Sequence, residues 1–113
     1  MKAIVLKALD ASRAHWRRHE RGKAREGEGI TNTDCALCGL FCNKNRTCKG
    51  CPVMATTGKE GCDDTPWLDA AFNFGSAHFH VTAKRMRKFL DSLVPKDAAR
   101  IRRSAAYKKA RLP

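Results

Sequence analysis

All six cysteines of this 113-residue chain lie between residues 35 and 62, and no other feature constrains the fold as strongly. Four of them form two CxxC pairs, Cys35 with Cys38 and Cys48 with Cys51. A CxxC turn brings two thiolates to one ion, and zinc takes four such ligands at the corners of a tetrahedron. The spacing therefore predicts a structural metal site built from cysteine side chains.

The rest of the sequence favours a reducing compartment for these thiols. The apolar run from Ala3 to Leu6 is too short for a secretory signal, and Lys7 interrupts it. No stretch approaches the roughly 18 apolar residues that a membrane span needs. We therefore expect a cytoplasmic protein with no membrane partner, in which CxxC pairs bind metal rather than form disulfides.

Several sets of four sulfur atoms satisfy this prediction. The two CxxC pairs form the first-choice set. Cys62 can replace either member of the second pair, because the ten residues before it form a loop that closes easily, and Cys42 is expected to be a free thiol. We expect Zn²⁺, with an iron–sulfur cluster or a binuclear zinc cluster of the fungal type as alternatives. The candidate metal ligands are Cys35, Cys38, Cys48, Cys51 and Cys62.

Two histidine pairs offer further nitrogen ligands. His15 and His19 are four residues apart on one face of a predicted helix, while His78 and His80 flank Phe79. The first pair lies among arginines that we expect to be exposed, and the second pair follows a predicted turn. We therefore favour roles other than metal binding for both pairs.

The apolar pattern predicts a mainly α-helical fold, a small helical domain with a central irregular cysteine-rich zinc knuckle. Thr65 as N-cap and Pro66 at the first helical position start one helix, whose inner face would carry Trp67, Ala70, Ala71 and Phe74. Apolar residues at helical spacing also predict a helix over residues 82–94. The expected elements of the single domain 1–113 are a helix over 2–21, a linker over 22–33, the metal-binding knuckle over 34–64, helices over 66–94 and a basic helix or tail over 96–113.

The net charge of +12 is concentrated in the C-terminal part of the chain. Residues 82–113 hold eleven basic and two acidic side chains, whereas residues 30–81 are nearly neutral. Such a field attracts polyanions, so we expect DNA or RNA as the partner, bound through basic helices. The expected contacts are Lys84, Arg85, Arg87, Lys88, Arg100, Arg102 and Arg103, then Lys108, Lys109 and Arg111, with Arg13, Arg17, Arg18 and Arg21 as a second strip.

The sequence contains no recognisable catalytic motif. It lacks a P-loop, a GxGxxG run and the His-x-Glu followed by Pro-Cys-x2-Cys of zinc deaminases. A catalytic zinc keeps one coordination position open, and this chain has enough cysteines to close the site. We therefore expect a non-enzymatic binding protein, with a metal-dependent nuclease as a lesser alternative.

Six short motifs occur together between about residues 5 and 95. They are Ser12-x2-His15-Trp16, Asp34-Cys-Ala-Leu-Cys38, Cys48-x-Gly50-Cys51-Pro52-Val53, Gly58-x3-Cys62, Thr65-Pro66-Trp67 and Leu90-x2-Leu93-Val94-Pro95. This combination resembles a group of small cysteine-rich proteins of bacteriophages and prophages. The resemblance implies a zinc-binding phage protein of the bacterial host cytoplasm and supplies no activity, so an inhibitor or adaptor that binds a host protein is the alternative to a nucleic-acid binder. Cys42 and the basic tail depart from the group.

Overall fold

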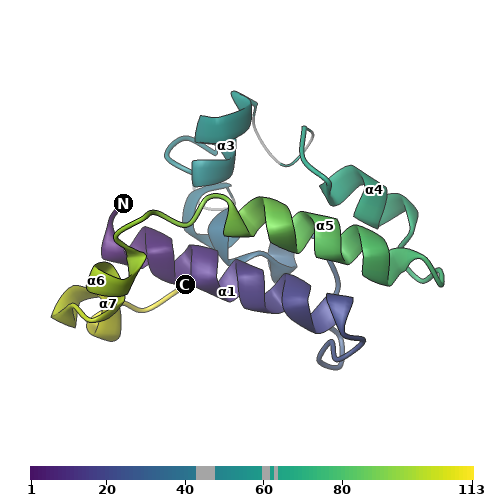
Figure 1. The fold of residues 1–113 in the computed structure, drawn as a ribbon, viewed down its shortest axis with the longest axis horizontal. Coiled ribbons are helices and arrows are strands. Elements are labelled where there is room, and N and C mark those ends of the chain that lie inside the picture. The colour runs from purple at the N-terminus through teal and green to yellow at the C-terminus, as the bar shows by residue number, and fades with distance from the viewer. Residues whose placement is uncertain (43–47, 60–61, 63) are drawn as a thin grey trace.

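The computed structural model describes residues 1–42, 48–59, 62 and 64–113, so residues 43–47, 60, 61 and 63 of the predicted knuckle lie outside the described residues. Within the described ranges every regular element is a helix, which confirms the prediction of a mainly α-helical fold. The elements are α1 (Ala3–Glu20), the 3-10 turn η1 (Asn32–Asp34), the π-helical segment η2 (Cys38–Cys42), α3 (Pro52–Thr57), α4 (Trp67–Phe72), α5 (Phe79–Asp91), α6 (Ala98–Arg102) and α7 (Ala105–Lys109) (Figure 1).

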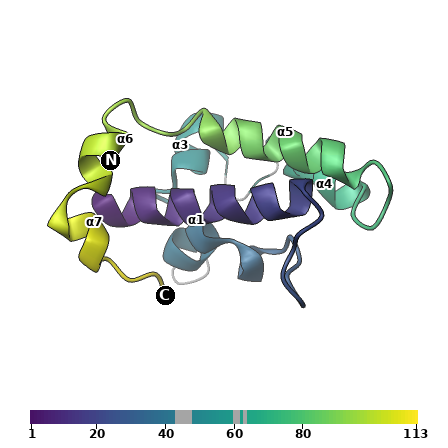
Figure 2. The same cartoon turned by 60° about the horizontal axis from the view of Figure 1, so that its bottom comes forward.

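Helices α1 and α5 lie side by side and antiparallel in the centre of the molecule (Figures 1 and 2). Each helix buries one apolar stripe, with Leu9 and Trp16 on α1 and Met86 on α5 at most 3% exposed. An ion pair from Arg13 to Asp91, with Nε–Oδ1 at 2.7 Å, fixes the middle of α1 against the end of α5. The pattern of apolar residues at helical spacing thus determines the central pair of helices.

Helix α4 begins at Trp67, one residue after the predicted first helical position, and Pro66 is its N-cap. Thr65 still behaves as a capping residue, because its Oγ1 accepts the Trp67 backbone N–H at 3.2 Å. The prediction that Phe74 lies on the inner face of this helix is wrong, because α4 ends at Phe72 and the Phe74 side chain is 52% exposed. Gly75, with φ of +84°, then reverses the chain, so α5 begins earlier than predicted.

The segment predicted as a linker, residues 22–33, is anchored to the core. Ile30 is 7% exposed, and its carbonyl oxygen accepts the Nε1–H of Trp67 at 2.8 Å. Glu28 binds two side chains of α1, as described below. This tertiary anchoring overrides the absence of any periodic pattern in the segment.

The basic C-terminal segment forms two short helices, α6 and α7, that pack against the N-terminal half of α1 (Figure 2). Ala98 and Ile101 bury their side chains there. Asp10 of α1 binds both Arg102, with Nε–Oδ2 at 2.9 Å, and the Tyr107 hydroxyl at 2.7 Å. No helix in the described ranges combines the length and apolar character of a bilayer-spanning helix.

Candidate functional site

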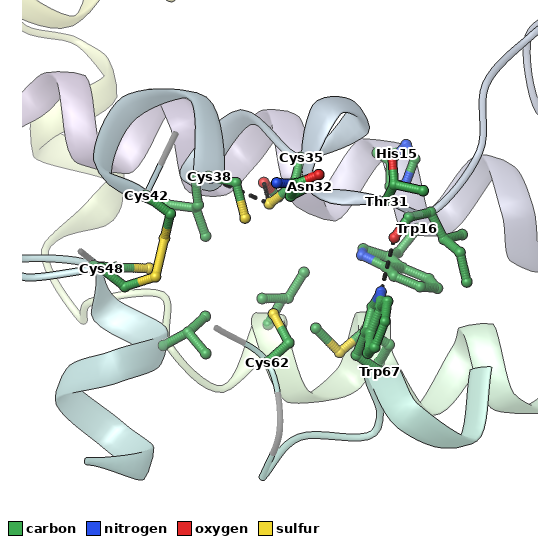
Figure 3. A pocket seen from close by; sticks show the side chains of 17 residues that line it. His15, Trp16, Thr31, Asn32, Cys35, Cys38, Cys42, Cys48, Cys62 and Trp67 are labelled. Atoms are coloured by element: carbon green, nitrogen blue, oxygen red, sulfur yellow. Dashed lines mark hydrogen bonds between the residues drawn. A yellow bond between two sulfur atoms is a disulfide. The ribbon is translucent and has the colours of Figure 1, made fainter. Parts of the chain in front are cut away.

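A cavity of about 350 Å³ lies beneath α1 and α5, and all six cysteines line it. Figure 3 shows Cys35 and Cys38 on one wall, Cys62 on the opposite wall, and Trp16 with Trp67 closing one end. Elements far apart in the sequence therefore direct their sulfur atoms toward one space.

The structure joins Cys42 and Cys48 in a disulfide at one end of the cavity (Figure 3). Cys42 is therefore not the free thiol that was expected, and Cys48 has no thiolate to offer in this state, in contrast to its place in the first-choice ligand set. The remaining four cysteines carry thiol groups: Cys35, Cys38, Cys51 and Cys62. Four thiols on one cavity match the number and type of ligands of a tetrahedral zinc site. Among the described residues, no three of these sulfur atoms lie within 4.8 Å of one another, so the thiols would have to move closer together to bind one ion.

Hydrogen bonds prepare one of these thiols for deprotonation. Three groups lower the pKa of Cys35 to about 6, although burial alone would raise it. They are the Cys38 thiol, the Cys38 backbone N–H at 3.4 Å from the Cys35 Sγ, and the Ser12 hydroxyl at 3.9 Å from the same atom. The contact between the two thiols raises the pKa of Cys38, which donates its proton to Cys35, and burial raises the pKa of Cys51. Cys35 is therefore the sulfur best prepared to receive a cation.

The turn before Cys51 shows why glycine is needed next to one CxxC pair. Gly50 has φ of +92°, and a Cβ atom there would lie 3.1 Å from Cε1 of Phe41. The turn closes through the Cys51 N–H, which donates to the Cys48 carbonyl oxygen at 2.9 Å. Gly39, beside the other pair, has no positive φ and no atom near its Cβ position.

A second group that could hold a metal ion consists of His15, His19 and Glu28, whose ligand atoms lie within 4.8 Å of one another. Both histidines are buried, 4% and 5% exposed, which contradicts the expectation that they lie among exposed arginines. The helical stripe of Ser12 and Trp16 continues through them, and this signal was available in the sequence.

Hydrogen bonds already occupy one ring nitrogen of each histidine and both carboxylate oxygens of Glu28. Glu28 Oε2 accepts from Nδ1 of His15 at 2.8 Å, and Nε2 of His19 lies 3.0 Å from the Gly29 carbonyl oxygen. Both carboxylate oxygens of Glu28 also bind the Arg18 guanidinium, whose contact lowers the pKa of Glu28 far below its ordinary value. Burial lowers the pKa of His15. A neutral histidine beside an arginine–glutamate pair favours an internal network over a bound cation.

The opposite side of α1 carries a basic hollow of about 310 Å³. Among the described residues that line it, only Asp10 is acidic, and Arg102 and Tyr107 bind that carboxylate. Its basic lining residues, which we call the α1 basic face, are Arg13, Arg17, Arg18, Arg21 and Lys23.

The members of the α1 basic face differ in how much of their charge is already neutralised. Arg13 binds Asp10 and Asp91, and Arg18 binds Glu28. Arg17, Arg21 and Lys23 are exposed and form no ion pair with any residue in the described part of the chain. Three exposed cations that lack an ion pair within the described ranges therefore line one hollow.

The α5 residues predicted to contact nucleic acid separate into two groups. Lys84, Arg85 and Lys88 are exposed. Arg87 instead binds Glu20, with Nε–Oε2 at 2.7 Å, and Asp91, with Nη1–Oδ2 at 2.7 Å, so its charge stabilises the α1–α5 contact. Arg87 lowers the pKa of Glu20, and the charges of Lys84 and Arg21 add to the shift. Lys84 therefore lies near the C-terminal end of the α1 basic face.

The C-terminal arginines separate in the same way. Arg102 binds Asp10 and connects α6 to α1, while Arg103 is exposed. Arg100 forms an exposed pair with Asp97. Arg87 and Arg102 thus form ion pairs with residues of α1, whereas Lys84, Arg85, Lys88 and Arg103 are exposed and form no ion pair with a described residue.

Comparison with protein-family models, curated proteins and solved structures gives no match for this chain. The candidate sites therefore rest on the residues and geometry described above. Lys23 is the member of the α1 basic face that the sequence did not indicate, because it follows the end of α1. The i, i+4 spacing of Arg13, Arg17 and Arg21 was the available signal for the rest.

Proposed function

We propose that this chain is a metal-stabilised, non-enzymatic protein that binds the phosphate backbone of nucleic acid through the α1 basic face. The observation that carries the proposal is the basic hollow, in which Arg17, Arg21 and Lys23 are exposed without ionic partners among the described residues. Guanidinium groups present several N–H donors in a plane and suit phosphate oxygens. Lys84, which lies close to Glu20, extends the positive surface onto α5.

The metal in this proposal is one zinc ion held by the four cysteine thiols of the cavity. They come from the residue after η1, the start of η2, the N-cap of α3 and the loop after α3, so a bound ion would link four places in the cysteine segment. The ion would supply stability rather than chemistry. The neutral cysteine segment would then serve to hold α1 in place.

Metal analysis of the purified protein, with the Cys42–Cys48 disulfide intact, tests this centre. We expect about one zinc per chain, lost in Cys35→Ser and Cys62→Ser but kept in Cys42→Ser, which alters the cavity outside the proposed ligand set. Iron with a visible absorption band would identify a cluster instead. Less than half an equivalent of either metal would overturn the centre, and loss in Cys48→Ser but not in Cys62→Ser would move the site to the two CxxC pairs.

Fluorescence anisotropy with labelled DNA and RNA tests the binding function. Three phosphate contacts give a slope of about −2.7 when the logarithm of the binding constant for duplex DNA is plotted against the logarithm of the salt concentration. A fourfold rise in salt should therefore raise the Kd by about 40-fold. The variant Arg17→Glu, Arg21→Glu, Lys23→Glu should abolish binding. The control, Lys108→Glu, Lys109→Glu, Arg111→Glu, has the same net charge and alters exposed residues in and after α7.

The comparison of these two triple variants decides whether the site is specific. A larger loss in the α1 variant supports the α1 basic face, because both variants reduce the total charge equally. Equal losses would mean that net charge alone causes the attraction, and the site would be wrong. If the unaltered protein binds neither DNA nor RNA at low salt, a host protein becomes the candidate partner.

A further inference from the structure

The Cys42–Cys48 disulfide shares its cavity with the four thiols of the proposed metal centre (Figure 3). Cys48 belongs to the second CxxC pair, and its sulfur cannot bind a metal ion as a thiolate while it is bonded to Cys42. Reduction of this one bond would raise the number of thiols that line the cavity from four to six. A tetrahedral zinc ion takes four of them, so the two states of the disulfide offer the ion different sets of ligands.

The backbone around Cys48 keeps this residue beside Cys51. The Cys51 N–H donates to the Cys48 carbonyl oxygen at 2.9 Å, and Gly50 between them has φ of +92°, so the backbone itself closes this CxxC turn. Both cysteines are buried, 6% and 5% exposed, and both line the cavity. Once released from Cys42, the Cys48 sulfur is therefore placed to form a ligand pair with Cys51.

Chain entropy favours Cys48 over Cys62 as the partner of Cys51. Cys48 lies three residues before Cys51, whereas Cys62 lies eleven residues after it. Closing a chelate ring through the nearer residue costs less conformational entropy, because this cost rises with the length of chain enclosed. We therefore expect Cys62 to complete the ligand set only while Cys48 is bonded to Cys42.

We propose that the Cys42–Cys48 disulfide is a redox switch that selects the fourth ligand of the zinc ion. While the disulfide is intact, Cys62 is that ligand, and after reduction Cys48 replaces it. The other three cysteines bind the ion in both states. This inference rests on the proposed metal centre and specifies how that centre is regulated.

The reductant of this switch is a dithiol. Its first thiolate attacks the sulfur of Cys42, the more exposed of the two bonded cysteines, and the S–S bond breaks with Cys48 as the leaving thiolate. The second thiol of the reductant then displaces Cys42 and closes the disulfide of the oxidised reductant. Two electrons pass to the protein bond. The two protons of the dithiol end on Cys42 and Cys62, because the Cys48 thiolate binds the ion in place of Cys62.

The exchange alters what the ion holds together without releasing it. The Cys62 carbonyl oxygen accepts the Thr65 backbone N–H at 3.2 Å and the Thr65 hydroxyl at 2.8 Å, directly before α4. Zinc bound to Cys62 thus ties the start of α4 to the cysteine segment, whereas zinc bound to Cys48 does not. The redox state of one bond therefore controls the attachment of α4.

A rescue experiment with two double variants tests the switch, with the full-length chain and zinc alone as the probe. The variant Cys42→Ser, Cys62→Ser frees Cys48 without any reductant, and we expect it to bind about one zinc per chain. The matched control, Cys48→Ser, Cys62→Ser, also lacks the disulfide and also retains four cysteines, but not the sulfur that the switch supplies. We expect this control to hold less than half an equivalent, as Cys62→Ser does with its disulfide intact.

Reduction of the single variant Cys62→Ser should have the same effect as the first double variant. A phosphine, which is oxidised to its oxide as it reduces the disulfide, should raise the zinc content from less than half an equivalent to about one. A phosphine is preferable here because the thiolates of a dithiol would compete for zinc. The five cysteines of this variant include the bonded pair, so thiol counting in denaturant should give three thiols before treatment and five after it.

The failure of this inference can be separated from failure of the metal centre. Equal zinc contents in the two double variants would overturn the switch, and so would a Cys62→Ser protein that retains zinc with its disulfide intact. In both cases a metal centre stands as long as the unaltered protein binds zinc. Absence of zinc from the unaltered protein in both redox states would overturn the centre as well.

Discussion

Replacing Glu28 by alanine should destabilise the fold much more than replacing an exposed carboxylate of the same segment. Its carboxylate accepts hydrogen bonds from His15 at 2.8 Å, from the Arg18 Nε at 3.0 Å and from the Arg25 backbone N–H at 3.0 Å. An ionised carboxylate can only accept, so Nδ1 of His15 is the donor in that contact.

The expected loss can be worked from these contacts. Without Glu28, the buried Nδ1–H of His15, a residue 4% exposed, has no acceptor, and this costs about 1–3 kcal/mol. The pair with Arg18 is partly exposed, with 25% of the arginine side chain accessible, and adds at most about 1 kcal/mol. We therefore expect the free energy of unfolding to fall by about 1–4 kcal/mol.

Urea unfolding of metal-loaded protein near pH 7.5, followed by circular dichroism, measures this loss. Glu26→Ala is the control, because Glu26 is an exposed carboxylate in the same segment, and its loss should stay within about 0.5 kcal/mol. Glu28→Gln retains one acceptor and should lie between the two. The network would be refuted if Glu28→Ala were no less stable than Glu26→Ala, and a drop in bound metal would show that the histidine group holds an ion after all.

Three further changes test other contacts. Gly50→Ala, at a φ of +92° and 3.1 Å from the Phe41 ring, should lower the free energy of unfolding by about 1–3 kcal/mol in urea, whereas Gly39→Ala should have no such effect. Trp67→Phe removes the donor to the Ile30 carbonyl oxygen and should cost about 1 kcal/mol in the same assay, and an unchanged midpoint would contradict it. Arg87 holds the pKa of Glu20 below its ordinary 4.5, so the stability from this pair is present above pH 4.5 and lost as the pH falls. The stability difference between the unaltered protein and Glu20→Gln should therefore shrink from about pH 5 to pH 3, and a constant difference would refute that origin.

The sequence predicts the helices well where an apolar stripe is long, and poorly where a contact is made across the fold. The stripe of α1 continues for five turns, so its limits, Ala3–Glu20, lie within one residue of the expected 2–21. Residues 22–33 have no periodicity, and their order comes from Glu28 and Ile30, which contact partners elsewhere in the chain. Local pattern contains no information on such partners.

The sequence also does not show which basic side chains are held in ion pairs. Arg87 and Lys88 are neighbours in one basic run, yet Arg87 is held by Glu20 and Asp91 while Lys88 is exposed. Arg87 and Asp91 are at i, i+4 spacing, a local signal that our sequence analysis did not use, whereas Glu20 lies 67 residues away along the chain. The cysteines pose the same problem, because the spacing of CxxC pairs does not specify which sulfur atoms a distant loop brings to the cavity.

Helix α1 connects the candidate metal centre to the proposed ligand surface. The cavity side carries Ser12 and Trp16, and the hollow side carries Arg17 and Arg21, since a helix of 3.6 residues per turn places these spacings on opposite faces. A metal that orders the cysteine segment would cover the apolar side of α1 and thereby fix the direction of its cations. Chelation should therefore weaken nucleic-acid binding although no proposed phosphate contact is a metal ligand. Charge reversal at Arg17 and Arg21 should leave the metal content unchanged, because neither side chain contacts the cysteine cavity.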